Sequence, residues 1–264
     1  MDERTQMACR SLAGALADAA RGETLRFFRQ TGLRADNKAV DGFDPVTEGD
    51  RAAEEAMRAL IETRRPSDGI LGEEFGQKPS ESGLTWVLDP IDGTRGYVAG
   101  TPTWGTLIAL HDGIKPVLGV IDQPYIGERF IGGLGEARMT GPQGMRNLYV
   151  SGVTALEDAM IFTTFPEVGT PDEAAAFRRV AEHCKLTRYG MDCYAYALLA
   201  AGQIDLVIEA GLQPYDIQAP IAVVEAAGGI VTNWTGGPAD KGGQAIAAAT
   251  PELHAAAMAL LDPA

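Results

Sequence analysis

The sequence predicts a mixed α and β fold in two parts that differ in pattern. Residues 1–142 open with helical periodicity and continue in apolar strands that are joined by tight turns. Residues 143–264 alternate short apolar strands with helical stretches. The stretch Gly141-Pro142-Gln143-Gly144 separates the two patterns, because glycine and proline interrupt regular structure and no apolar residue anchors them. We therefore expect two halves, 1–142 and 143–264, that meet at this stretch.

Two helices are predicted at the start of the first half. Residues 4–30 carry apolar residues at helical spacing, and a second helix follows with Met57 and Ile61 on one face. Thr47 and Asp50 match the Thr-x-x-acid capping box that opens many helices. From the residues alone, Asp50 is either a helix cap or a cap that also takes part in chemistry.

The remaining elements follow from short apolar runs that are bounded by turn residues. In the first half, strands are predicted at residues 70–72, 86–88, 103–110, 116–121 and 129–131. In the second half, strands are predicted at residues 159–162, 187–189, 204–209 and 230–232, with an apolar stretch at 245–248. Helices of the second half are predicted at residues 172–184, 194–201, 216–227 and 251–261.

Composition excludes several classes of protein. The 264 residues carry a net charge of −14 and no basic stripe, so nucleic acid is not an expected partner. The charged start of the chain does not predict a signal peptide, and no apolar run approaches the roughly 18 residues that cross a membrane. Three cysteines lack metal-site or redox spacing, which favours a reducing cytoplasm.

The stretch Trp86–Thr94 changes abruptly from apolar to acidic. Pro90 lacks an N–H and has a fixed φ, so we expect it to end the strand that starts at Trp86. Asp89 and Asp92 would then lie together on a stiff corner, where two carboxylates repel each other and favour a divalent cation. Asp-Gly is also an ordinary turn dipeptide, so this stretch alone leaves a plain turn and a metal site as alternatives.

Acidic residues elsewhere in the chain favour the metal site. Glu73 follows a short apolar strand, and Asp216 precedes a helical pattern. Together with Asp89 and Asp92 they form a dispersed set of oxygen ligands without suitably spaced histidine or cysteine, which suits Mg²⁺, Mn²⁺ or Ca²⁺ rather than Zn²⁺. Asp is also a preferred helix N-cap, so a structural role stays open for Asp216.

Three motifs together resemble the inositol monophosphatase family, which belongs to the Mg²⁺-dependent, lithium-sensitive phosphomonoesterases. They are Gly72-Glu73-Glu74, Asp89-Pro90-Ile91-Asp92-Gly93-Thr94, and Tyr215-Asp216 followed by Gly228-Gly229. The resemblance runs from about Asp44 to the C-terminus. It implies a layered αβαβα sandwich like that of inositol monophosphatase and fructose-1,6-bisphosphatase, with an α+β half, an α/β half and the active site between them. It also implies a homodimer that acts on a small phosphorylated metabolite.

The resemblance assigns roles to the residues of these motifs. It implies two or three Mg²⁺ ions, with Mn²⁺ as an alternative, and their ligands would be Glu73, Asp89, the Ile91 carbonyl, Asp92 and Asp216. Thr94, hydrogen-bonded to Asp50, would orient the nucleophilic water, and Glu73 would share in catalysis. The N–H groups of Gly93 and Thr94 would open a short helix and bind the phosphate. Lys38 occupies a position where this family often carries a loop lysine that faces the metal.

The expected substrate depends on residues 188–196. This run contains Arg188, Asp192 and three tyrosines, and it resembles the histidinol-phosphate phosphatase branch of the family, as does Tyr215. A carboxylate at Asp192 suits the ammonium and imidazole groups of L-histidinol phosphate, and aromatic residues can stack on the ring. By resemblance, Arg188 and Glu209 also contact the substrate. The structural alternatives are a helix N-cap for Asp192 and core packing for the tyrosines.

We therefore expect a cytoplasmic, Mg²⁺-dependent phosphomonoesterase that uses an activated water and converts L-histidinol phosphate to L-histidinol, a step of histidine biosynthesis. Alternatives within the same class are inositol 1-phosphate, another sugar phosphate or an adenosine bisphosphate. Outside enzymes, the alternative is a metal-binding scaffold with a vestigial site. The intact acidic set argues against a vestigial site, because sequence drift would have broken at least one member.

Overall fold

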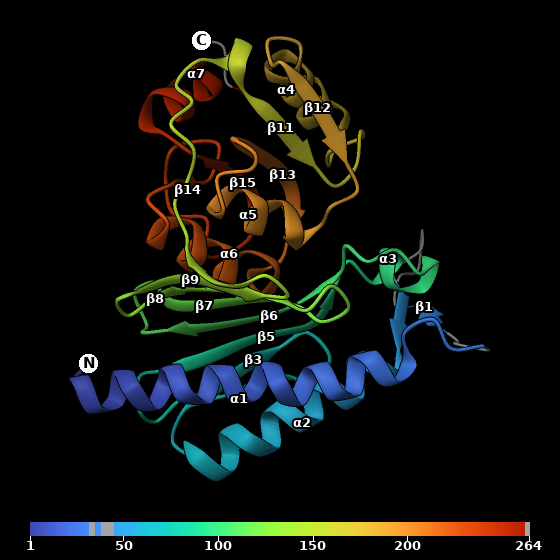
Figure 1. Cartoon of the computed structure of the whole chain (residues 1–264), viewed down its shortest axis with the longest axis vertical. Coiled ribbons are helices and arrows are strands. Elements are labelled where there is room, and N and C mark those ends of the chain that lie inside the picture. The colour runs from blue at the N-terminus through green and yellow to red at the C-terminus, as the bar shows by residue number, and fades with distance from the viewer. Residues whose placement is uncertain (32–34, 38–44, 262–264) are drawn as a thin grey trace.

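The computed structural model describes residues 1–31, 35–37 and 45–261, and these form five stacked layers (Figure 1). Two large sheets alternate with three layers of helices in the order αβαβα. The layered sandwich that the sequence predicts is therefore confirmed. Lys38 lies outside the described residues.

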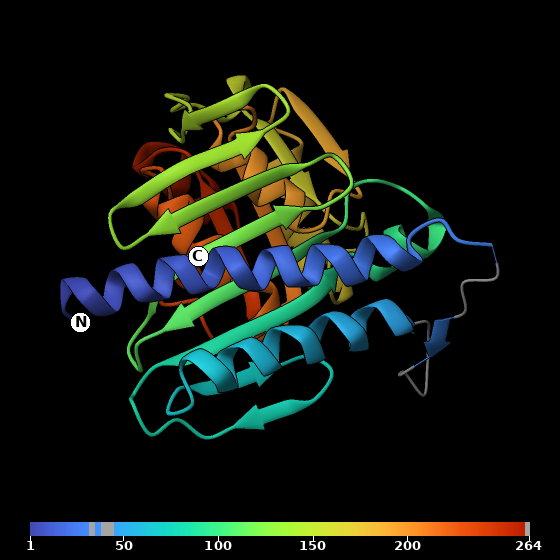
Figure 2. The same cartoon turned by 60° about the horizontal axis from the view of Figure 1, so that its bottom comes forward.

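The first helical layer consists of α1 (Glu3–Phe27) and α2 (Glu48–Arg64), which lie side by side across one face of the larger sheet (Figure 2). Leu16 of α1 and Met57 of α2 are fully buried in one core cluster with Trp86 of the sheet. Burial of each such side chain stabilises the fold by about 1.5–3 kcal/mol. The apolar stripes of the two helices therefore explain both their helical periodicity and their place on the sheet.

The second layer is an eight-stranded sheet with the order β10-β9-β8-β7-β6-β5-β3-β4. Its strands are β3 (Gly69–Gly72), β4 (Gly76–Lys78), β5 (Thr85–Asp92), β6 (Gly105–His111), β7 (Pro116–Gln123), β8 (Glu128–Gly133), β9 (Glu136–Gly141) and β10 (Gly144–Asn147). β3 and β5 pair in parallel, and the other neighbours pair antiparallel. Residues 142–143 form the turn between β9 and β10, so this sheet continues through Asn147. The division into halves at 142/143 stays a proposal.

β5 differs from the predicted strand at Pro90. The sequence predicts a strand end there, but β5 continues through Asp92. Its pairing with β6 is regular up to Asp89 opposite Leu107, and the register shifts before Asp92. Proline is tolerated at such an irregularity because the ladder needs no hydrogen bond from it there. The predicted strand end was therefore wrong, and Pro90 marks a bulge instead.

The middle helical layer consists of α5 (Cys193–Ala200) and α6 (Pro214–Ala226), and it lies between the two sheets (Figure 1). Val87 of the first sheet, Val223 of α6 and Val207 of the second sheet belong to one buried cluster. One apolar core therefore joins the two sheets and holds residues from both in a fixed relation.

The second sheet has five strands in the order β12-β11-β13-β15-β14. They are β11 (Met160–Thr163), β12 (Leu186–Tyr189), β13 (Leu206–Leu212), β14 (Ile230–Thr232) and β15 (Gly243–Ala248). β12, β11 and β13 are parallel neighbours, whereas β15 pairs antiparallel with β13 and β14. The outer helices α4 (Pro171–Ala181) and α7 (Pro251–Leu261) cover its far face (Figure 1). The short elements are β1 (Ala35–Asn37), β2 (Pro45–Thr47), α3 (Thr94–Ala99) and the 3-10 helix η1 (Leu156–Asp158).

Candidate active site

β5 brings Asp89 and Asp92 to one side of the first sheet. Val87 faces the middle helical layer, and the alternation of side chains along a strand puts Asp89 on the same face. In a regular strand, residues three apart point to opposite faces. The register shift between Asp89 and Asp92 removes this conflict, so both carboxylates reach the space between the sheets.

Asp216 of α6 joins these two carboxylates. One oxygen from each of Asp89, Asp92 and Asp216 lies within 4.8 Å of the other two. α6 begins at Pro214, and Asp216 Oδ2 accepts a hydrogen bond of 2.7 Å from Gln213 N. Gln213 is thus the N-cap and Asp216 is the third helical residue, so the N-cap alternative for Asp216 is wrong.

Backbone donors orient all three carboxylates. Asp89 Oδ1 accepts from Ile91 N at 3.0 Å, and Asp92 Oδ2 accepts from Cys193 N at 2.6 Å. Cys193 is the first residue of α5, so its N–H ties the second part of the chain to the first. Bonds of this kind hold ligand side chains in place for a cation.

Glu73 extends the acidic wall. It follows β3 directly, and its N–H donates to Leu88 O at 3.2 Å, beside Asp89. Glu73, Ile91 and Thr94 line the same pocket as the three aspartates, and this pocket has a volume of about 400 Å³. The structure therefore brings together the five ligands that the sequence predicts.

Repulsion among these carboxylates is the main electrostatic feature of the pocket. Burial raises the pKa of Asp89 and Asp92 well above the ordinary range, and the neighbouring carboxylates, Asp216 among them, raise it further. A divalent cation between them would relieve this repulsion. The donors are carboxylate oxygens and one carbonyl, which suit Mg²⁺ rather than Zn²⁺. The residues present therefore fit a magnesium site.

Thr94 and Asp50 differ from the expected arrangement. Thr94 Oγ1 donates to Ile91 O at 2.9 Å. Asp50 Oδ2 accepts from Thr47 N at 2.8 Å, which confirms the predicted capping box of α2. Among the described residues Asp50 Oδ1 has no hydrogen-bond partner, and burial raises the pKa of this carboxyl to about 7. The Thr94–Asp50 hydrogen bond was therefore predicted wrongly, because Asp50 instead closes the first turn of its own helix.

Asp192 occupies the N-cap position of α5 without capping the helix. Its side chain makes no capping hydrogen bond. Its φ of 47° lies in the left-handed region that residues other than glycine rarely adopt. The carboxylate lies against Gly93, where an added Cβ would approach Asp192 Cγ to 2.9 Å. Asp192 thus lines the pocket, and the capping alternative is wrong.

Glu209 of β13 lines the pocket from the second sheet. Its Oε1 accepts from Thr164 N at 2.7 Å and from Thr164 Oγ1 at 2.9 Å, and its Oε2 accepts from Thr163 Oγ1 at 3.1 Å. Burial raises the pKa of Glu209 to about 7, although the threonine bonds oppose the shift. The same dominant cause raises the pKa of Asp192 to about 6.

Tyr194 and Tyr196 serve the fold rather than the pocket. Tyr194 Oη donates to Glu128 Oε2 at 2.7 Å, and Tyr196 is buried in the core. Arg188 is exposed on β12 and does not line the pocket. The predicted stacking of these tyrosines on a substrate ring is therefore wrong, and core packing is confirmed for Tyr196.

Other residues of the pocket were missed in the sequence. The guanidinium carbon of Arg95 lies 4.9 Å from the centroid of the Phe165 ring, and both residues line the pocket with Tyr215. Arg95 also opposes the raised pKa of Asp192. Its position directly after Thr94 was a usable signal, whereas nothing in the residues near Phe165 indicates the pocket.

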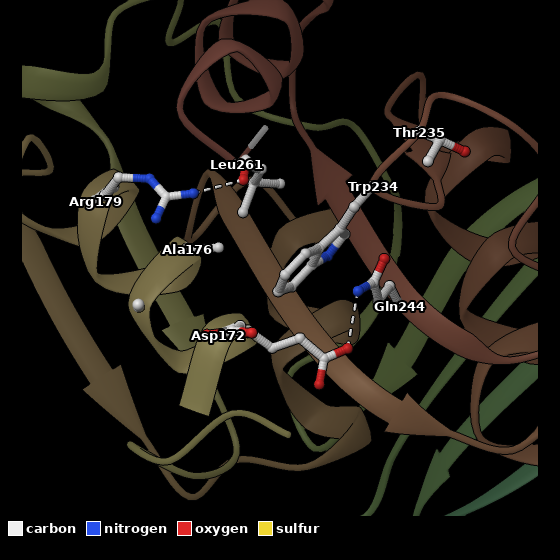
Figure 3. Close-up of a pocket in the computed structure, with 9 residues that line it drawn as sticks. Asp172, Ala176, Arg179, Trp234, Thr235, Gln244 and Leu261 are labelled. Atoms are coloured by element: carbon white, nitrogen blue, oxygen red, sulfur yellow. Dashed lines mark hydrogen bonds between the residues drawn. The ribbon is translucent and has the colours of Figure 1, made fainter. Parts of the chain in front are cut away.

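A second cavity of about 460 Å³ lies between α4, β15 and the end of α7 (Figure 3). Three of its polar side chains already bond to the protein: Arg179 Nη2 donates to Leu261 O at 2.7 Å, and Gln244 Nε2 donates to Glu173 Oε1 at 2.8 Å. In the described part of the chain, the carboxylate group suited to a metal occurs only in the first pocket. The chemistry therefore belongs to the first pocket.

Comparison with known proteins agrees with this geometry. The model of the inositol monophosphatase family matches residues 2–263. The chain belongs to this family. It is 45% identical to the chloroplastic bifunctional phosphatase IMPL2 of Arabidopsis thaliana, over 86% of this chain and 64% of that protein. It is 36% identical to histidinol-phosphatase of Streptomyces coelicolor, over 92% of each. A solved inositol monophosphatase of Zymomonas mobilis has a TM-score of 0.86 and 39% identity, over 99% of each chain.

Membership of the family carries a general activity. The chain is a phosphomonoesterase, a hydrolase of small phosphate esters. The family is Mg²⁺-dependent, and the group formed by Asp89, Asp92 and Asp216 could hold such an ion. None of the described helices combines the length and the apolar character needed to span a membrane.

Proposed function

We propose that this phosphomonoesterase hydrolyses L-histidinol phosphate to L-histidinol. The observation that carries the proposal is the position of Asp192, a pocket carboxylate that makes no capping bond and is held against Gly93. The substrate has an ammonium group and an imidazole, and a carboxylate binds such cations by charge-assisted hydrogen bonds. The similarity to a protein named histidinol-phosphatase supports the same substrate.

The acidic side of the pocket would hold two or three Mg²⁺ ions through Glu73, Asp89, the Ile91 carbonyl, Asp92 and Asp216. When bound, Mg²⁺ would lower the pKa of water and stabilise the negative charge that develops on the leaving oxygen. The contribution of the chain is orientation, because the N–H groups of Ile91 and Cys193 fix the carboxylates of Asp89 and Asp92.

Thr94 would orient the attacking water. Its hydroxyl hydrogen is directed to Ile91 O, so its oxygen can accept a hydrogen bond from the water. Glu73 lines the same pocket and would accept the other hydrogen of the water. Gly93 has a φ of 83°, which a residue with a side chain rarely adopts, and we assign the N–H groups of Gly93 and Thr94 to the phosphate.

Other residues that line the pocket would bind the rest of the substrate. Asp192 would accept hydrogen bonds from the ammonium group, and Phe165 and Tyr215 offer aromatic surface to the imidazole. Glu209, with a pKa of about 7, can bind the imidazole as a carboxylate or share a proton with it. Arg95 keeps part of the negative charge of Asp192 balanced before the substrate enters.

Inositol 1-phosphate is the second candidate substrate. It is favoured by the likeness to the inositol monophosphatase of Zymomonas mobilis, and its hydroxyls could donate to the same carboxylates. A homodimer in the cytoplasm is also part of the proposal, and sedimentation of the purified chain would test its dimeric state.

The test is Mg²⁺-dependent phosphate release, with kcat/KM measured for both substrates on wild type, Asp192→Asn and Asp172→Asn. Asp172 is an exposed aspartate that lies outside the pocket, within residues 143–264 like Asp192. Asp172→Asn therefore changes the net charge of the protein as Asp192→Asn does, and serves as the control. We expect wild type to prefer L-histidinol phosphate and Asp192→Asn to lower its kcat/KM about 10- to 100-fold, mainly through KM. Preference for inositol 1-phosphate would overturn the proposed substrate. An equal loss on both substrates would remove the specificity role of Asp192.

A further inference from the structure

Glu54 of α2 carries a fully buried carboxylate that is not part of the pocket wall. Oε2 accepts a hydrogen bond of 2.7 Å from Glu74 N, and Oε1 accepts bonds of 3.2 Å from Phe75 N and 2.7 Å from Arg58 Nε. Burial of a charge is costly unless a counter-ion and hydrogen bonds compensate for it. Here Arg58 supplies the counter-ion, and the backbone directly after Glu73 supplies the other donors.

Gly72 allows the carboxylate of Glu54 to reach this position. A Cβ added to Gly72 would collide with that carboxylate, and the nearest side-chain atoms it would meet all belong to Glu54. Glu54 therefore contacts the chain on both sides of Glu73, at Gly72 before it and at Glu74 after it. This contact gives a physical reason for glycine in the Gly72-Glu73-Glu74 motif.

Three successive backbone N–H groups fix the segment that carries Glu73. The N–H of Glu73 itself donates to Leu88 O of β5, and the N–H groups of Glu74 and Phe75 donate to Glu54. The first bond sets the distance of the segment from Asp89, and the other two set its direction. Without Glu54, the segment would keep one of these three bonds.

We propose that Glu54 is the positioning residue for Glu73. By fixing the backbone, Glu54 holds the carboxylate of Glu73 where it can bind Mg²⁺ together with Asp89. This inference rests on the proposed function, because it takes Glu73 as a metal ligand. Residues that orient a metal ligand without binding the metal typically contribute about 10- to 100-fold in metal affinity or activity. Glu54 acts through the backbone on either side of Glu73, at Gly72 and at Glu74, and touches neither metal nor substrate.

The test is Glu54→Gln in the full chain. Glutamine keeps the volume and one accepting oxygen, but its NH₂ group cannot accept a hydrogen bond from a backbone N–H. We expect the Mg²⁺ affinity, measured by calorimetry with the metal alone, to fall about 10- to 100-fold. KM for the phosphate ester at saturating Mg²⁺ should stay unchanged. In the metal-free protein, the amide hydrogens of Glu74 and Phe75 should exchange faster than in wild type.

Asp68→Asn is the matched control. Like Glu54, Asp68 is buried and pairs with an arginine, here Arg65 at the C-terminal end of α2. Unlike Glu54, it lies directly before β3 and accepts a hydrogen bond of 3.0 Å from Trp86 Nε1. We expect this variant to lose stability without a change in Mg²⁺ affinity. If Glu54→Gln does not fold, Glu54→Asp replaces it, because it keeps the charge but shortens the reach to the two N–H donors.

The outcomes separate the inference from the function on which it rests. Unchanged Mg²⁺ affinity in a folded Glu54 variant would overturn the inference alone, as would an equal loss of affinity in Asp68→Asn. Wild-type protein that neither binds Mg²⁺ nor releases phosphate would overturn the proposed function, and the inference with it.

Discussion

Two groups of residues in the pocket differ in what surrounds their negative charge. The acidic corner lies at the ends of β3 and β5 and in the first turn of α6, and consists of Glu73, Asp89, Asp92 and Asp216. The pocket rim is the name we give to Arg95, Phe165, Asp192 and Glu209, which line the same pocket. After burial, the largest influences on the pKa of Asp89 and Asp92 are other carboxylates. For Asp192 and Glu209 they are Arg95 and Thr164, which oppose the shift.

This difference indicates which of the two groups needs a bound cation. The acidic corner consists only of carboxylates, so a cation must neutralise their charge. A backbone donor orients each of its aspartates before the cation binds. In the pocket rim, Arg95 and Thr164 offset part of the effect of burial on Asp192 and Glu209, so these residues depend less on a bound cation.

The largest effect is expected from Asp89→Asn in the acidic corner. Loss of a metal ligand and its charge should lower kcat about a thousandfold or more, because metal ions contribute several kcal/mol of transition-state stabilisation. The metal-free variant should also have a higher Tm than metal-free wild type at pH 7.5, since an amide removes both the buried charge and the carboxylate repulsion, the two causes that raise the pKa of Asp89. Steady-state kinetics and thermal unfolding with and without Mg²⁺ measure both effects.

Asp68→Asn again provides the control for this variant. It removes a buried carboxylate that pairs with Arg65, so it should lower the Tm and leave the Mg²⁺ response intact. A normal kcat in Asp89→Asn, or a Tm below that of metal-free wild type, would show that the acidic corner does not work as described.

A smaller effect, on stability, is expected from Glu209→Gln in the pocket rim. The pKa of Glu209 is about 7 in the folded protein, against an ordinary value of 4.5, so the folded state keeps a proton that the unfolded chain loses. The free energy of unfolding should therefore fall as the pH rises from about 4.5 to about 7 and then level off. The difference in pKa corresponds to about 3 kcal/mol.

Glutamine cannot titrate, so this part of the pH dependence should disappear in Glu209→Gln. Its Oε1 can still accept from Thr164, and the Thr163 hydroxyl can turn to accept from the new NH₂ group. Urea denaturation of the metal-free proteins at pH 5 and pH 8 measures the effect, with Glu167→Gln as an exposed control in the same half. Parallel pH curves for wild type and Glu209→Gln would exclude the assigned pKa.

The acidic corner could be predicted from the sequence because its ligands lie in short motifs at strand and helix ends. Glu73, Asp89, Asp92 and Asp216 all line the pocket. The hydrogen bonds of Asp89 and Asp92 could not be predicted, since the first depends on the local irregularity of β5 and the second on a partner distant in the chain. The donor to Asp92 comes from α5, 101 residues away.

The pocket rim and several strands were harder to predict for other physical reasons. Asp192 lies at the N-cap position that the rules for helix caps assign to it, but its φ of 47° departs from the extended backbone of a capping residue, and its side chain makes no capping bond. Phe165 sits after β11 with no pattern around it that distinguishes a pocket residue from an exposed one. All four residues of β10 (Gly144–Asn147) are exposed, so this strand has no apolar alternation, and its glycine turn resembles a domain boundary.

The smallest effect is expected from Tyr194→Phe, which tests whether the tyrosine run belongs to the pocket rim. The change removes the hydrogen bond to Glu128 and keeps the ring against Phe130, whose centroid is 6.2 Å away. The free energy of unfolding should fall by about 1 kcal/mol. Both kcat/KM values, for L-histidinol phosphate and inositol 1-phosphate, should stay within about twofold of wild type. A rise in KM confined to L-histidinol phosphate would show that Tyr194 contacts this substrate. A residue that only packs in the core would lower the stability of the protein without a selective effect on one substrate.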